Sequence, residues 1–234
     1  MADSREIILG GLRRALRRAA ADDGAAAAVR DRLDEHRPNT IPARAASLDH
    51  DGQVALFETM AAEVSATIAR VASLAEVPGA VAAYLAAHNL PARLVVTPDS
   101  ALEPVPWAEH PTLELRRGIV GADDLVGVTG SFAGIAETGT LMLISGPESP
   151  TRNNFLPDNH IVVLRAEQIV PTYEEGWVRL RALKTLEGGH FTMPRTVNFI
   201  TGPSRTADIE MKIELGAHGP RRLHIVLVDE PPDD

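Results

Sequence analysis

Six short apolar runs from residue 94 onward constrain the fold more than any other feature of the sequence. Several of them are apolar on consecutive positions, not on every second one, which indicates strands buried on both faces. Strands of this kind are typical of largely parallel sheets that helices cover on both sides. The runs lie at 94–96, 125–128, 141–144, 161–164, 197–200 and 223–228.

Helical segments fit between some of these runs, notably at 172–184, so we predict an open, largely parallel α/β sheet. The runs near 125 and 141 are too close for a helical crossover, and we expect an antiparallel pair or a short helix there. Aromatic residues are only 4% of the chain, so its core must consist of Val, Leu, Ile and Ala side chains.

The region before the first run is predicted to be helical. Apolar residues spaced three or four apart predict helices over 4–20, 51–73 and 77–89, whereas the prolines in 21–50 favour a linker or an arm. The chain thus divides into an N-terminal helix and linker arm at 1–50, a single α/β domain at 51–228 and an acidic tail at 229–234.

Composition excludes several classes of function. A net charge of -9 argues against a general nucleic-acid binder, which needs a basic face. The absence of cysteine excludes disulfides, thiolate nucleophiles and cysteine-ligated zinc or iron–sulfur clusters. No apolar run approaches the roughly 20 residues of a membrane span. Without an HExxH motif or another compelling ligand set, we expect neither a metal nor a cofactor.

A glycine-rich turn at 127–140 is the first candidate site. It follows a buried strand and contains one carboxylate, Glu137. Thr138 and Gly139 come directly after this glutamate. Glycines let a backbone approach a ligand closely, and a glutamate there can act as a base or as a nucleophile. The alternative is that Glu137 caps a backbone turn. The spacing matches neither a dinucleotide-binding loop nor a Walker A loop.

A second candidate follows the apolar run at 197–200. Ser204, Thr206 and Asp208 are residue types that begin helices, and a helix starting there directs free N–H groups at an anion. Arg205 can add a bidentate clamp for a carboxylate or phosphate. The alternative is an exposed turn with a solvated arginine.

Two histidines complete the set of candidates. His218 lies among glycines at 216–220, where it can shuttle a proton or satisfy a turn. His160 opens a predicted strand, where it can face the same sheet edge as Glu137 or remain a structural histidine.

Together these segments resemble the lactate-utilisation (LUD) domain, and within it the protein C branch. The resemblance rests on Ala-Glu-Thr-Gly-Thr at 136–140, Leu-Pro followed by His-Ile-Val-Val at 156–163, Phe-Ile-Thr-Gly-Pro-Ser-Arg-Thr-Ala-Asp-Ile-Glu at 199–210, and Gly with His-Gly-Pro at 216–220. The order and spacing of these segments are those of the family.

The resemblance implies an open Rossmann-like sheet, the fold of the sugar-phosphate isomerase and CoA-transferase superfamily. It also implies a role in oxidising L-lactate to pyruvate within a bacterial cytoplasmic system, whose sister subunits carry the iron–sulfur clusters. We expect catalytic roles for Glu137 and His218. The expected substrate-binding residues are Thr138, Gly139, His160, Gly202, Ser204, Arg205, Thr206 and Asp208.

Three hypotheses remain open at the level of sequence. The first is an accessory or substrate-handling subunit that binds a small carboxylate through Arg205. The second is a stand-alone isomerase or acyl-transfer enzyme that uses Glu137, by analogy with the glutamate nucleophile of the superfamily's CoA transferases. The third is an interaction scaffold that docks through its helical front end.

Overall fold

A computed structural model describes residues 3–16, 23–38, 40–186, 193–207 and 213–230, which fall into two compact units, Met1–Thr40 and Ile41–Asp234. The first unit contains helices α1 (Ser4–Ala15) and α2 (Asp23–Glu35), neither of which has a buried residue. The helix predicted over 4–20 is present up to Ala15, and its last residues lie outside the described ranges. The linker predicted at 21–50 is wrong in part, because its alanine run favours α2.

The second unit begins with α3 (Ala43–Ala46) and α4 (His50–Glu63). The helix predicted over 51–73 is therefore too long. The chain leaves the helix at Ser65, whose φ is +71°, and continues as strand β1 (Thr67–Val71). Helix α5 (Val77–Ala87) agrees with the prediction over 77–89.

A six-stranded, entirely parallel sheet forms the centre of this unit, as the apolar runs predict. Its order is β1, β12 (Arg222–Val228), β7 (Asn159–Arg165), β4 (Val126–Gly130), β2 (Arg93–Val96) and β3 (Glu114–Arg117).

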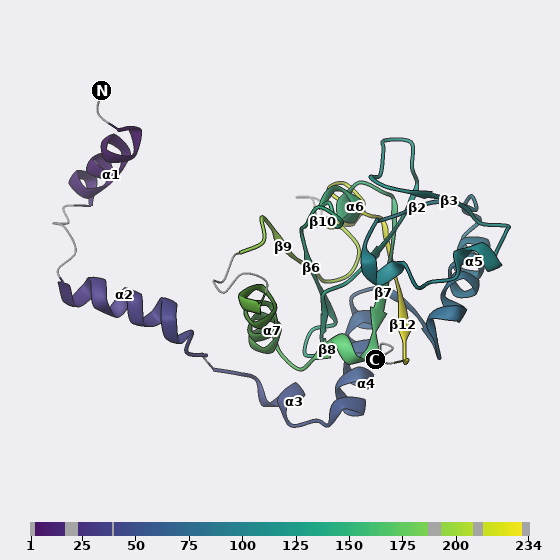
Figure 1. Cartoon of the computed structure of the whole chain (residues 1–234), viewed down its shortest axis with the longest axis horizontal. Coiled ribbons are helices and arrows are strands. Elements are labelled where there is room, and N and C mark those ends of the chain that lie inside the picture. The colour runs from purple at the N-terminus through teal and green to yellow at the C-terminus, as the bar shows by residue number, and fades with distance from the viewer. Residues whose placement is uncertain (1–2, 17–22, 39, 187–192, 208–212, 231–234) are drawn as a thin grey trace. The chain divides into compact units, whose positions relative to one another are not determined.

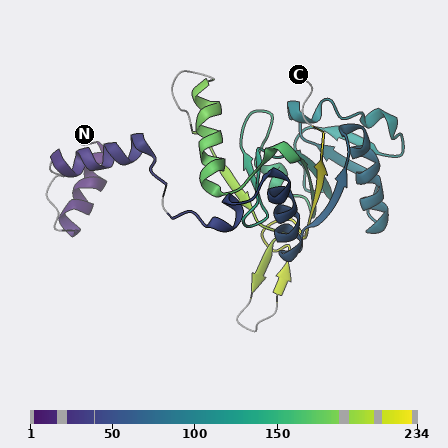
Figure 2. The same ribbon diagram turned by 90° about the horizontal axis from the view of Figure 1, so that it is seen from below.

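The antiparallel pair expected between the runs near 125 and 141 is not formed, but a second, four-stranded sheet contains an antiparallel pair that includes the run at 141. That pair is formed by β5 and β6, because β4 belongs to the central sheet. The order is β8 (Ile169–Val170), β5 (Ala133–Ile135), β6 (Thr140–Ile144) and β9 (Val197–Ile200). A separate hairpin of β10 (Arg205–Ala207) and β11 (Ile213–Leu215) projects from the domain (Figure 2).

Short elements connect these sheets. The remaining α-helices are α6 (Arg152–Phe155) and α7 (Tyr173–Leu186), and the 3-10 turns are η1 (Leu74–Glu76), η2 (Ser100–Leu102), η3 (Trp107–Glu109) and η4 (Ala166–Gln168).

Aliphatic side chains on both faces of the central sheet build the core. One face packs against α5 through residues such as Val81, and the other against α4 and the second sheet through Phe57 and Leu141. Helix α7 covers the remaining face of the second sheet, where Leu180 meets Met142. Figure 1 shows these layers in succession, from α7 through β6 and β7 to α5. No helix in the described part of the chain is long and apolar enough to cross a membrane.

Candidate functional site

A pocket of about 260 Å³ lies at the N-terminal ends of β7 and β12, and we call it the β7–β12 pocket. Apolar side chains form part of its wall, including Phe155, Phe199 and Leu223. It brings together five of the ten predicted site residues from segments distant in the sequence. These five are His160, Gly202, Ser204, Arg205 and His218.

His160, the second residue of β7, is the most deeply buried polar residue of this pocket. Its side chain is 0% exposed, and its Nε2 lies 2.8 Å from the hydroxyl of Thr129. Its Nδ1 has no hydrogen-bond partner among the described residues. Burial lowers the pKa of His160 to about 3, so the ring is neutral at pH 7. When the Thr129 hydroxyl donates to Nε2, the proton of the neutral ring is on Nδ1, an atom that solvent does not reach.

Arg205 lies at the exposed side of the pocket, at the start of β10. One of its guanidinium nitrogens donates to the carbonyl of Val64 at 3.1 Å, and it forms no ion pair with any described residue. The helix start predicted near Ser204 is wrong, because this segment pairs with β11. The N–H of Ser204 donates to Pro220 at 2.9 Å and is not available to an anion. The hydroxyl of Ser204 and the guanidinium of Arg205 remain as donors.

The other predicted residues of the segment 199–210 do not all lie at the pocket. Thr206 lies on β10 and does not line the pocket, and Asp208 lies outside the described residues. Gly202 has a φ of +76°, and a Cβ there would come within 2.2 Å of the Val64 carbonyl oxygen. Glycine thus lets this loop approach the end of α4. His218 is exposed at the pocket's edge.

Glu137, Thr138 and Gly139 lie in the β5–β6 turn of the second sheet and line neither of the two cavities described here. An oxygen of Glu137 accepts the backbone N–H of Tyr173 at 3.2 Å, at the first residue of α7. The hydroxyl of Thr138 contacts those of Thr140 and Tyr173 at 2.7 and 3.1 Å. Of the two alternatives for His160, the structure does not support a shared sheet edge with Glu137, because His160 lies on β7 of the central sheet and Glu137 in a turn of the second sheet.

A larger cavity of about 540 Å³, which we call the β2–β4 cleft, lies at the C-terminal ends of those two strands. The sequence offered a signal for it, since Thr129, Gly130 and Ser131 come from the glycine-rich segment, but none of the three was predicted as a site residue. Asn154 lines both cavities. The hydrogen bond between Thr129 and His160 joins them, because Thr129 lines the cleft and His160 lines the pocket.

Comparison with known proteins identifies the family. Residues 54–228 match the LUD domain, and the chain belongs to the LUD domain family, as the motifs indicate. A "Lactate utilization protein C" of Deinococcus radiodurans is 37% identical over 168 residues, which are 67% of this chain and 70% of that protein.

A second "Lactate utilization protein C", of Geobacillus sp. strain WCH70, is 37% identical over 105 residues, 45% of this chain. The match spans only 42% of the length of that relative. The crystal structure of a DUF162 family protein from Deinococcus radiodurans aligns with a TM-score of 0.57 and 27% identity, over 77% of this chain and 99% of that one. The likeness confirms the fold class predicted from the apolar runs.

Proposed function

We propose that this chain serves lactate utilisation as a substrate-handling subunit of a cytoplasmic system that oxidises L-lactate to pyruvate. The names of its relatives support the process, and the β7–β12 pocket supports the role. The observation that carries the proposal is that one pocket brings the guanidinium of Arg205 together with Ser204 and the neutral, buried His160.

The pocket offers what a small carboxylate requires. Arg205 supplies positive charge and paired N–H donors, which match the two oxygens of a carboxylate. The hydroxyl of Ser204 adds a neutral donor. Phe155 and Phe199 provide apolar surface for a methyl group. His218, exposed at the edge, is placed to exchange a proton between a bound acid and water.

Electron transfer in this scheme belongs to other subunits. The chain has no cysteine, so it cannot ligate an iron–sulfur cluster through thiolates, and iron–sulfur sister subunits are the proposed partners. The alternative function, an isomerase or acyl-transfer enzyme using Glu137, gains no support from the geometry. The hydrogen bond from Tyr173 occupies one oxygen of that carboxylate, and Glu137 lines neither cavity.

The direct test is the binding of L-lactate and pyruvate to the full chain by calorimetry. Arg205→Gln should weaken binding about tenfold, because a charge-assisted hydrogen bond contributes about 1.5–3 kcal/mol and Arg205 is exposed. Arg93→Gln is the matched control, since Arg93 is also exposed and lines neither pocket nor cleft. In a strain that lacks this gene, a copy with Arg93→Gln should restore growth on L-lactate, whereas a copy with Arg205→Gln should restore it poorly.

Two results would contradict the proposal. If the wild-type chain and Arg205→Gln bind both acids with equal affinity, the β7–β12 pocket is not the carboxylate site. If the deletion strain grows normally on L-lactate and has no second copy of the gene, the chain is not required for lactate oxidation.

A further inference from the structure

We infer that the β2–β4 cleft is a second binding site, separate from the proposed carboxylate pocket, and that it takes an uncharged polyhydroxylated molecule such as a sugar or a nucleoside. The proposal does not depend on lactate being the ligand of the β7–β12 pocket. It rests on the position of the cleft in the sheet, on the chemistry of its lining and on the contacts that fix its walls.

The cleft lies where the strand order of the central sheet reverses. After β2 the chain continues to β3 on one side of it, whereas after β4 the next strand of this sheet is β7, on the opposite side. Connections that diverge in this way leave a crevice outside the C-terminal ends of the two strands, where ligands of open α/β sheets bind. Thr97, which follows β2, and Gly130, which ends β4, both line the cleft.

The polar groups of the lining suit hydroxyl groups and disfavour anions. The lining includes the hydroxyls of Ser100 and Ser149 and the carboxylates of Asp99 and Glu148, and no basic side chain among the described residues. Carboxylates accept hydrogen bonds from ligand hydroxyls, as acidic residues do from the ribose of dinucleotides. The same carboxylates repel a phosphate or a carboxylate ligand.

Asn154 supplies the clearest unused group. Its side chain is 6% exposed, lines the cleft and forms no hydrogen bond with another described residue. The amide is not among the buried polar atoms that lack a partner, so solvent reaches it, and a ligand with both donors and acceptors could bind it in place of water. Sugar hydroxyls provide both. Phe132 adds an apolar ring to the lining. The guanidinium of Arg179 lies 5.7 Å from the centroid of this ring and donates to the carbonyl of Glu167. Arg179 itself does not line the cleft.

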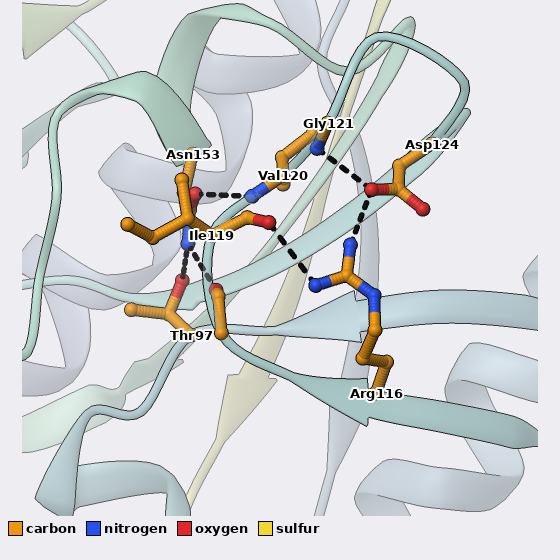
Figure 3. A network of polar contacts seen from close by, with 8 residues as sticks. Thr97, Arg116, Ile119, Val120, Gly121, Asp124 and Asn153 are labelled. Carbon is orange, nitrogen blue, oxygen red and sulfur yellow. Dashed lines mark hydrogen bonds and ion pairs between the residues drawn. The ribbon is translucent and has the colours of Figure 1, made fainter.

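A buried polar network holds the wall formed by Thr97 and α6. The amide of Asn153 donates to Thr97 at 2.8 Å and to the Gly118 carbonyl at 2.9 Å, and its oxygen accepts the Val120 N–H at 2.8 Å. Figure 3 shows Asn153 between Thr97 and Val120, with Arg116 bound to Asp124 beyond them. Because Asn153 precedes Asn154 on α6, this network fixes the position from which Asn154 faces the cleft.

Gly130 lets the acidic wall come close to the strand end. A Cβ at this position would lie 2.8 Å from Oδ2 of Asp99, so only glycine leaves that oxygen room beside β4. The other oxygen, Oδ1, accepts the N–H of Ala101 at 3.0 Å and orients the carboxylate. The volume of about 540 Å³ is within the 300–1,000 Å³ that small-molecule pockets typically occupy.

The test is binding of adenosine, AMP, D-ribose and D-glucose to the full chain, measured by saturation-transfer NMR and calorimetry. We expect at least one uncharged probe to bind with a Kd below about 10 mM, and adenosine to bind more tightly than AMP. Asp99→Asn, which keeps an N-capping side chain, should weaken that binding about fivefold to tenfold. Glu148 is exposed, and Glu148→Lys should reduce or reverse the difference in affinity between adenosine and AMP, because it replaces a negative charge by a positive one.

The Arg205→Gln variant separates this proposal from the carboxylate pocket, since it should leave the binding of uncharged probes unchanged. The inference is overturned if no uncharged probe binds, if AMP binds the wild-type chain more tightly than adenosine does, or if Asp99→Asn folds normally and retains full affinity. Loss of lactate binding in Arg205→Gln with unchanged adenosine binding would support both sites independently.

Discussion

Gly139 is the residue of the turn at 136–140 whose role the backbone geometry defines most sharply. Its φ is +62°, and a Cβ there would lie 2.2 Å from the backbone nitrogen of Ala61 in α4. Gly139→Ala should therefore lower the free energy of unfolding by about 3 kcal/mol, because it combines overpacking with a strained backbone. Denaturant unfolding of the full chain measures this difference.

Gly146→Ala is the control for that substitution. Gly146 is exposed, and nothing lies within 4 Å of a Cβ built there, so the change should stay within about 0.5 kcal/mol. A similar small effect at Gly139 would contradict the close packing of the β5–β6 turn on α4.

The buried histidines make stability depend on pH. Burial lowers the pKa of His160 to about 3, and burial, with a smaller contribution from His88, lowers that of His224 to about 4. Below pH 6.5 the unfolded chain protonates both rings while the folded chain does not, so the unfolded state binds more protons. The free energy of unfolding should then fall as pH falls from about 6.5 to about 4, by up to about 1.4 kcal/mol per pH unit for each histidine.

Unfolding in denaturant at pH 7.5, 6.0 and 5.0 measures this slope. His224→Asn should reduce the slope by about one proton, whatever it does to stability at pH 7.5, and it retains a polar group near the Thr67 hydroxyl, 2.9 Å from Nδ1. His50→Asn, at an exposed position, should leave the slope nearly unchanged. An unaltered slope in His224→Asn would show that His224 is not held neutral by the fold.

At the scale of elements, the sequence predicts those helices and strands whose positions depend on the spacing of apolar residues along a short stretch of chain. Consecutive apolar residues identify buried strands such as β7 and β12, because both faces of the central sheet are covered. The error at the end of α4 has a long-range cause. The apolar spacing of the helix continues through Ile68 and Val71, but those residues pair in parallel with β12, more than 150 positions later. A short window of sequence contains no information about that partner.

The candidate site shows the same division. The residues of the β7–β12 pocket come from motifs recognisable in the sequence, whereas their grouping depends on which sheet each strand joins. The segment from 126 to 144 illustrates this, since β4 enters the central sheet and β5 and β6 enter the second one. Glu137 follows β5 into the turn of the second sheet, whereas His160 lies on β7 of the central sheet. Likewise, β10 forms because β11 is available to pair with it, and local helix-capping residues at 204–206 do not prevail.

At the scale of the whole molecule, the two compact units differ in how much they bury. All three apolar clusters lie within Ile41–Asp234, while α1 and α2 bury no residue and expose Ile8, Leu12 and Leu33. A chain of residues 41–234 should therefore fold alone, with a Tm within about 3 °C of the full chain, because little buried surface is lost. Scanning calorimetry of both chains measures this.

A longer deletion is the matched control, since removing residues 1–63 also removes α4. That helix contributes Phe57, which is 0% exposed, to the core between the two sheets, and loss of a buried phenylalanine alone costs about 3–5 kcal/mol. The 64–234 chain should lose cooperative unfolding while 41–234 keeps it. If 41–234 also unfolds without cooperativity, residues 1–40 must stabilise the α/β domain directly. If it folds but no longer assembles with the iron–sulfur subunits proposed above, the exposed apolar residues of α1 and α2 serve docking, as the scaffold hypothesis requires.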